Sequence, residues 1–388
     1  MTTEHVAAHT VHADPRAAGK DLAQQINTAL SAAPDAIVLF ASSSFDYTVL
    51  LETLQEQCRP GVLVGASSAG EFTNASRGTG TASALAIRSD DIVVSAGLGT
   101  GISGDSRAAA REIVTEFKGM HGKRYPYRAA LIMTDALAGH AEEFVEEMTL
   151  LTSGRYLLAG GGAGDDANFS RTHVFLGTQI HTNAAVALEL LSMKPLGVGV
   201  GHGWEPSGTA LRATEVEGMT VRGLNGLPAI EAFERHAEAT GQVLDHGNPL
   251  PFFLHNILGV ETGDGYRLRV PLAFDEHGGV HCAAEVPEQA RVFIMKTTAA
   301  SAAVAAARAT KAAVEALGDH KPGAAVFFDC VATRLRTGNE FGFELEMVAN
   351  ALAGAPFVGC NTYGQIARSD SQFSGFHNCT AVVLALPT

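Results

Sequence analysis

Positive charge and cysteine are both scarce in this sequence. Its 388 residues hold 27 Lys and Arg against 41 Asp and Glu, a net charge of −14, and no Lys- or Arg-rich patch appears. Because nucleic acids and anionic membrane surfaces are bound through such patches, we expect neither as a partner. The five cysteines are odd in number, scattered and never spaced as Cys-x-x-Cys, which predicts free thiols in a reducing cytoplasm.

Long apolar runs and common enzyme motifs are also missing. No apolar run approaches the roughly 20 residues of a transmembrane helix, and residues 1–15 show no basic-then-apolar signal peptide. There is no His-Glu-x-x-His zinc motif, no Walker loop and no complete dinucleotide-binding fingerprint. We therefore expect a cytoplasmic protein that is not an enzyme.

A glycine-rich stretch occurs three times, and the rest of the chain is arranged around it. The copies span 63–72, 157–166 and 357–366. Each follows another apolar run, at 36–41, 129–134 and 324–329, which starts 27, 28 and 33 residues earlier. That spacing accommodates strand, helix and strand, so we predict three βαβ crossover units. Their glycine-rich loops should lie at the carboxyl ends of strands, where α/β sheets bind small molecules.

The predicted fold class is α/β, with two domains that are each a mixed sheet flanked by helices and built on these repeated units. A hydrophobic content of 46% with 18% charged residues is that of a globular chain, and its length favours two or more domains. We expect an N-terminal segment and helix in 1–30, a first domain in 31–240 and a second in 241–388. Residues 83–87 and 92–98 flank a Ser-Asp-Asp turn and predict two paired strands.

Several motifs, in order along the chain, resemble the FIST family. Those similar to the FIST N domain are Val64-Gly65-x-Ser67-x-Ala69-Gly70-Glu71, Gly161-Gly162-x-Gly164-Asp165-Asp166 and Gly201-His202-Gly203-Trp204. Those similar to the FIST C domain are Phe328-Asp329-Cys330-Val331-Ala332-x-Arg334, Gly359-x-x-Thr362-Tyr363-Gly364-Gln365-Ile366 and Phe376-His377-Asn378-x-Thr380. The family usually carries Glu where this chain has Gln365, which argues against any role that needs a carboxylate there.

The resemblance implies a sensory protein that binds a small ligand and regulates a separate histidine kinase or cyclic-di-GMP enzyme. A chain of this size, with both domains and no attached signalling domain, looks like the NosP-type branch, which senses nitric oxide through haem b. The same resemblance leaves a homo-oligomer open. On this interpretation the 31–240 domain is the FIST N-like sensory domain and 241–388 is the FIST C-like domain.

His202 is the candidate axial ligand for such a haem. It follows an apolar, glycine-rich strand, so a flat macrocycle could approach the backbone, and Trp204 could stack on it. The alternative is a structural histidine that hydrogen-bonds neighbouring loops.

The glycine-rich loops support a second interpretation, in which the chain binds an amino acid or another small polar metabolite. Successive backbone N–H groups at 160–164 or 67–70 could cradle an anion, while Glu71, Asp165 and Asp166 could hold an ammonium group. The glycines could equally serve only tight packing and turns. The candidate ligand-binding residues are Ser67, Ser68, Glu71, Gly161, Asp165, Asp166, Trp204, Asp329, Arg334, Asn361, Tyr363 and Gln365.

A third interpretation is a hydrolase. Ser67 lies in a stretch that matches Gly-x-Ser-x-Gly only loosely. Cys330 follows Asp329, and we expect that carboxylate to raise the pKa of the thiol and weaken it as a nucleophile.

Overall fold

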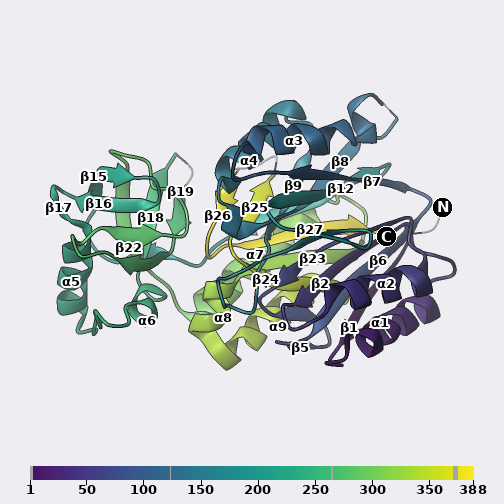
Figure 1. Cartoon of the computed structure of the whole chain (residues 1–388), viewed down its shortest axis with the longest axis horizontal. Coiled ribbons are helices and arrows are strands. Elements are labelled where there is room, and N and C mark those ends of the chain that lie inside the picture. Colours follow the sequence, from purple (N-terminus) through teal and green to yellow (C-terminus); the bar gives the residue numbers. More distant parts are fainter. Residues whose placement is uncertain (1–2, 123, 264, 370–374) are drawn as a thin grey trace.

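Three six-stranded sheets with the same internal strand pattern form the body of the molecule (Figure 1). The structure is a computed structural model that describes residues 3–122, 124–263, 265–369 and 375–388. The first sheet has the order β1 (Thr3–Thr10), β6 (Ala82–Ser89), β2 (Ala36–Ser42), β3 (Val62–Ser68), β10 (Val174–Leu176) and β11 (Gln179–His181). The second has the order β7 (Ile92–Thr100), β12 (Ala184–Ser192), β8 (Tyr127–Thr134), β9 (Leu157–Gly162), β25 (Gln365–Arg368) and β26 (Gly375–His377). The third has the order β13 (Gly197–Gly201), β27 (Ala381–Pro387), β23 (Pro322–Cys330), β24 (Phe357–Thr362), β4 (Glu71–Thr73) and β5 (Arg77–Gly78).

The predicted crossover units form the centre of each sheet. Strands β2 and β3, β8 and β9, and β23 and β24 pair in parallel, and every other strand pair in these sheets is antiparallel. The crossovers contain α2 (Tyr47–Cys58), α4 (Ala141–Leu151) and α9 (Phe341–Ala351). The α/β fold class with mixed sheets flanked by helices is therefore confirmed.

The two short strands that follow each parallel pair in the chain join a neighbouring sheet. Strands β4 and β5 follow β3 in the chain but complete the third sheet beside β24. In the same way, β10 and β11 follow β9 and complete the first sheet, whereas β25 and β26 follow β24 and complete the second. No sheet is therefore completed by its own unit, and the three units are tied into a ring of exchanged strands.

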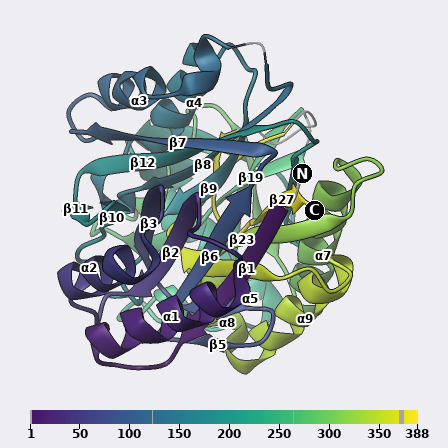
Figure 2. The same cartoon turned by 90° about the vertical axis from the view of Figure 1, so that its right-hand side faces the viewer.

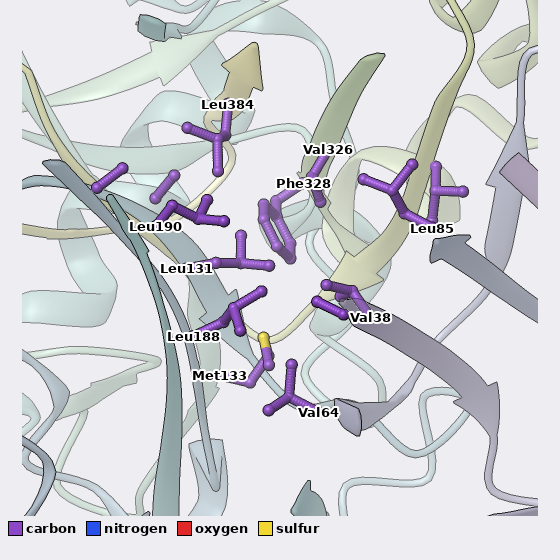
Figure 3. Packing of buried hydrophobic residues seen from close by; sticks show 14 of the residues in the cluster. Val38, Val64, Leu85, Leu131, Met133, Leu188, Leu190, Val326, Phe328 and Leu384 are labelled. Atoms are coloured by element: carbon purple, nitrogen blue, oxygen red, sulfur yellow. The ribbon is translucent and has the colours of Figure 1, made fainter. Parts of the chain in front are cut away.

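Buried strands divide their side chains between a central core and an outer one. In β2 every residue is buried; Val38 and Phe40 face the central core, while Ile37 and Leu39 pack under helices. Leu131 and Phe328, from the second and third sheets, meet Val38 in that central core (Figure 3). This period of two, with both faces apolar, is the pattern of a strand covered on both sides.

Pairs of helices cover the outer faces of the three sheets (Figure 2). The pairs are α1 (Pro15–Ala29) with α2, α3 (Ser106–Thr115) with α4, and α7 (Ala299–Glu315) with α9. Helix α1 starts where the sequence signals it, because Asp14 accepts a hydrogen bond from the backbone N–H of Ala17 and Pro15 opens the first turn.

A separate β-rich body lies between β13 and α7 and projects from the three-sheet core (Figure 1). Its nine-stranded sheet contains β14 (Glu205–Pro206), β15 (Leu211–Glu217), β16 (Thr220–Leu224), β17 (Leu227–Pro228), β18 (Ile257–Thr262), β19 (Gly265–Arg269), β20 (Pro271–Phe274), β21 (Val280–Cys282) and β22 (Arg291–Lys296). Helices α5 (Ala229–Thr240) and α6 (Leu250–Phe253) belong to it. Its first and last strands pair through Glu205 and Lys296, so the chain enters and leaves side by side.

The expected pairing of residues 83–87 with 92–98 is wrong. Strand β6 pairs with β1 and β2 in the first sheet, and β7 pairs with β12 in the second. The short Ser-Asp-Asp segment is thus a link between two units, because both strands find longer apolar partners elsewhere. The domain boundaries at 30/31 and 240/241 stay a prediction. Within the described residues, no helix is both long and apolar enough to cross a membrane.

Candidate functional site

The three glycine-rich loops meet at one place, at the carboxyl ends of β3, β9 and β24. The backbone N–H of Gly164 donates to Ser67 O at 2.9 Å, that of Asn361 donates to Gly70 O at 2.8 Å, and that of Tyr363 donates to Gly162 O at 2.9 Å. Each loop is therefore hydrogen-bonded to the next, and the expected convergence of the loops is present. Carboxyl ends of parallel strands are the usual place for small-molecule sites in such sheets.

Glu71 and Gln365 hold equivalent places at this junction. Glu71 accepts hydrogen bonds from the Ser68 hydroxyl at 2.6 Å and from the Thr81 hydroxyl at 2.7 Å. Gln365 donates to the Thr362 hydroxyl at 2.8 Å and accepts from the Thr380 backbone N–H at 3.1 Å. Both side chains are fully buried, and both tie a glycine-rich loop to the start of the strand that follows.

Burial controls the charge of Glu71. It raises the pKa of this carboxyl to about 7, although hydrogen bonds from Ser68 and Thr81 act in the opposite direction. At neutral pH a large share of Glu71 is therefore protonated and uncharged. A buried amide meets the same hydrogen-bonding needs at Gln365, so a carboxylate is not required at either position for the loops to close.

Asp165 and the Oδ2 atom of Asp166 accept hydrogen bonds from the second loop and its neighbours, whereas Oδ1 of Asp166 has no partner among the described residues. Asp165 accepts from the backbone N–H groups of residues 169–171 and from the Tyr363 hydroxyl, whose ring stacks on Phe169 at 4.4 Å. Burial acts to raise the pKa of Asp165, but these hydrogen bonds outweigh it and leave the pKa lowered. Asp166 accepts from the Ser42 hydroxyl at 2.8 Å and the Ser43 backbone at 2.7 Å. These contacts fix the shape of the loop.

Unsatisfied polar atoms gather beside the third loop. Asn361 is fully buried, yet neither Oδ1 nor Nδ2 has a hydrogen-bond partner among the described residues. The same holds for Nε of Arg334, on α8 (Val331–Thr337), and for Oδ2 of Asp329, the register partner of Asn361 on the neighbouring strand. A Cβ placed on Gly70 would lie 2.9 Å from Asn361 Oδ1 and 3.3 Å from Arg334 Nε, so both atoms face one point. We call Asp329, Arg334, Arg336 and Asn361 the Arg334 cluster.

The electrostatics of the Arg334 cluster favour an anionic guest. Within the described chain, neither Arg334 nor Arg336 forms an ion pair with a carboxylate within 4.0 Å. Burial and the nearby Glu344 raise the pKa of Asp329, and burial raises that of Glu344 to about 7. Protonation of these buried carboxyls reduces the negative charge near the two arginines, although Arg336 acts to lower the pKa of Glu344.

Trp204 is buried in an apolar cluster with Cys330, Ala332 and Cys379, next to the Arg334 cluster. The Arg336 guanidinium stands 5.3 Å from the centre of its ring, a cation–π distance. The other predicted ligand-binding residues on the loops, from Ser67 to Gln365, do come together. Sequence reasoning missed Arg336, Glu344, Thr81 and Thr380. The two threonines had a signal, since each directly precedes a further apolar strand of its unit.

His202 does not fit the role of haem ligand in this geometry. Its Nδ1 accepts from the Trp204 backbone N–H at 3.3 Å, so its Nε2 carries the proton and donates to Tyr266 O at 3.2 Å. Burial lowers its pKa and keeps it neutral, but both ring nitrogens are engaged. Among the described residues, no cluster of three or more His, Cys, Asp or Glu could hold a metal ion.

The hydrolase interpretation requires a base that is hydrogen-bonded to Ser67 or Cys330. Among the described residues, no His side chain forms such a hydrogen bond with either. The Ser67 hydroxyl accepts from the His173 backbone N–H at 2.9 Å and donates to its carbonyl at 3.3 Å. The expected upward shift at Cys330 is wrong: hydrogen bonding from Cys379 lowers the pKa of the Cys330 thiol to about 6. Asp329 does not prevent this, because its own raised pKa leaves it largely uncharged.

Two family comparisons cover most of the chain. Residues 35–227 match the FIST N domain, and residues 231–368 match the FIST C domain. The chain belongs to the FIST family. FIST domains are sensory and signal-transducing domains that bind ligands, and the meeting point of the loops is the candidate for that role in this FIST protein.

Other comparisons add little to this FIST assignment. Curated proteins give no match. Among solved structures, a cyanuric acid hydrolase from A. caulinodans is similar, with 9% identity, full coverage of both chains and a TM-score of 0.35. A similarity of that size leaves the function of this FIST protein to be argued from its own residues.

Proposed function

We propose that this FIST protein senses a small polar metabolite with a carboxylate group, such as an amino acid, bound at the Arg334 cluster. The observation that supports this most is the set of buried polar atoms of Asn361 and Arg334 that have no hydrogen-bond partner among the described residues. Leaving a buried donor or acceptor unsatisfied costs about 1–3 kcal/mol. Because Asn361 Oδ1 and Arg334 Nε face one point, a ligand that satisfies both would recover much of that cost.

The side chains of the cluster have complementary tasks. The Arg334 guanidinium is suited to a carboxylate, which it can bind through two parallel hydrogen bonds. The Asn361 amide can donate through Nδ2 and accept through Oδ1, so it suits the amino or hydroxyl group next to that carboxylate. Asp329, protonated by virtue of its raised pKa, can donate as well as accept.

The position of the cluster links ligand binding to the rest of the molecule. Gly70 belongs to the first unit, Asn361 to the third, and both loops are bonded to the second. A ligand there would stabilise one arrangement of the three units over another, which is the physical requirement of a sensor. We propose a cytoplasmic location and a separate histidine kinase or cyclic-di-GMP enzyme as the partner, on the basis of family resemblance.

Haem-based sensing of nitric oxide stays a prediction that rests on the resemblance alone. The contacts of His202 do not favour it. A titration of the purified protein with hemin tests it: a Soret band that disappears in His202→Ala would support it, and a featureless spectrum would end it.

A ligand screen tests the proposed metabolite site. Thermal unfolding is followed with the common amino acids and with small mono- and dicarboxylates, and a ligand at a hundred times its dissociation constant adds about 2.7 kcal/mol of stability. Calorimetry on the best compound should then show a Kd raised at least about tenfold in Arg334→Ala, since charge-assisted hydrogen bonds are worth about 1.5–3 kcal/mol.

The matched control is Arg16→Ala, which removes an exposed arginine on α1 and should leave binding unchanged. Arg334→Lys separates charge from geometry, because lysine keeps the charge but loses the bidentate fork. Equal affinity in Arg334→Ala and the native protein, or no stabilisation by any compound screened, would contradict the proposal.

A further inference from the structure

A cavity of about 850 Å³ lies at the opposite ends of the strands from the glycine-rich loops. It is bounded by the first residues of β8 and β9, by the segment before β13, by the last residue of β25 and by the end of α7. Three arginines line it, namely Arg128, Arg155 and Arg368, together with Tyr125, Tyr127 and Tyr156. None of these residues belongs to the Arg334 cluster or to the loops.

Backbone carbonyls hold the three arginines in place. Arg128 donates to Gly122 O at 2.6 Å and to Tyr125 O at 3.3 Å, Arg155 donates to Thr152 O at 3.4 Å, and Arg368 donates to Tyr156 O at 2.6 Å. A guanidinium has five N–H donors, so each arginine is positioned by some of them and keeps others for a guest.

No carboxylate of the described chain forms a direct ion pair with these arginines. None of the three appears in an ion pair within 4.0 Å, in a protein whose net charge is −14. The nearby buried Glu189 is already satisfied, because it accepts from the Tyr156 hydroxyl, the Ser95 hydroxyl and the backbone N–H groups of Lys118 and Gly119. Among the described residues, the three arginines therefore line the cavity without a salt bridge to any carboxylate.

Of the tyrosines that line the cavity, Tyr156 is uncharged and Tyr127 is exposed. Burial, followed by the hydrogen bond to Glu189, raises the pKa of Tyr156, so it stays a neutral phenol. The Arg128 guanidinium lies 5.9 Å from the centre of its ring. Tyr127 is 41% exposed at the mouth, which leaves its ring free to contact a ligand.

We propose that this cavity is a second ligand site, for a small molecule that carries two or more phosphate charges. Arginine forks match phosphate oxygens bidentately, and three of them set around one space can bind a diphosphate that a single surface arginine could not hold. The site is independent of the proposed metabolite site, and it gives the sensor a second input at the other end of the same strands.

Inorganic pyrophosphate is the probe, and calorimetry at about 50 mM and about 200 mM salt is the measurement. We expect measurable binding that weakens at the higher salt, and a Kd raised at least tenfold in Arg155→Ala and in Arg368→Ala. Arg155 is exposed and its side chain contacts only Thr152 O and the sulfur of Met120 in the described structure, so its variant should fold normally; circular dichroism and the melting temperature verify this for both variants.

Two control variants decide where the anion sits. Arg16→Ala should bind pyrophosphate as the native protein does, and so should Arg334→Ala, since Arg334 lies at the other end of the strands. The proposal is overturned by absence of binding at millimolar pyrophosphate, by native affinity in a folded Arg155→Ala, or by a loss in Arg334→Ala equal to that in Arg155→Ala. Absence of pyrophosphate binding, or native affinity in Arg155→Ala, would leave metabolite binding at the Arg334 cluster to its own test with carboxylates.

Discussion

Glu71 and Gln365 show how one position can be filled by a carboxyl or an amide. Both side chains are fully buried, and both connect a loop hydroxyl to the residue that starts the next strand. In the second unit a different residue makes the corresponding connection. Asp135 accepts hydrogen bonds from the Thr172 hydroxyl and from the backbone N–H of Asn183, which directly precedes β12. The glutamine that departs from the family pattern is therefore a structural equivalent of Glu71.

Glu71→Gln should remove a pH dependence of stability. Burial raises the folded-state pKa of Glu71 from 4.5 to about 7, so ionisation costs more in the folded than in the unfolded state. That cost is absent below pH 4.5, grows as the pH rises to 7 and is complete above it. Relative to Glu71→Gln, the native protein should lose about 2 kcal/mol of unfolding free energy between pH 5 and pH 8.

Denaturant unfolding of both proteins at the two pH values measures this difference. Gln365→Glu is the matched variant, because it places a second carboxyl at the equivalent site and should create a loss of the same sign. Parallel pH profiles for the native protein and Glu71→Gln would show that Glu71 does not titrate in this range.

At the scale of single elements, one glycine in each repeat brings the two parallel strands together. A Cβ on Gly65, Gly160 or Gly359 would lie 2.1, 1.9 or 2.0 Å from a carbonyl oxygen of the neighbouring strand. The repeated glycines therefore serve packing within the sheet. This role is compatible with a binding role for the loop that follows, so the two interpretations of the glycine-rich stretches are not exclusive.

Gly359→Ala should destabilise the protein by at least about 2 kcal/mol, because backbone must move to admit the methyl group. Besides the carbonyl, the methyl would meet the ring of Phe72 at 2.3 Å, which belongs to the exchanged strand β4. The melting temperature reports the loss. Gly104→Ala is the control, since the nearest atom to its Cβ is 3.6 Å away; similar melting temperatures for the two variants would contradict the packing role.

At the scale of the whole molecule, the exchange of strands makes the three units mutually dependent. The second sheet needs β25 and β26 from the end of the chain, and the third needs β4 and β5 from its beginning. The FIST N and FIST C matches meet between residues 227 and 231, inside the inserted β-rich body, so neither segment contains a complete set of three sheets.

A fragment of residues 1–227 should therefore not fold stably alone. It lacks β25 and β26, which leaves the edge of β9 open, and its β4 has no β24 to pair with. We expect aggregation or a broad, non-cooperative melt by circular dichroism, because unpaired strand edges and exposed apolar surface promote association. Co-expression with residues 228–388 should restore a soluble complex. A monomeric fragment 1–227 with a sharp transition would contradict this dependence.

The linear pattern was enough to place the three crossover units, the glycine-rich loops at strand ends and most residues that gather there, such as Ser67, Asp165 and Asn361. These features are local: the period of two in β2 and the small residues at Gly65 or Gly359 act over a few positions. Which sheet receives β4, β10 or β25 was decided only by the folded chain, because strands of three or four residues have no preference of their own and pair where a distant edge is open. The arginines likewise became visible only in three dimensions, since the absence of a carboxylate partner for Arg334 or Arg155 among the described residues depends on every element packed around them.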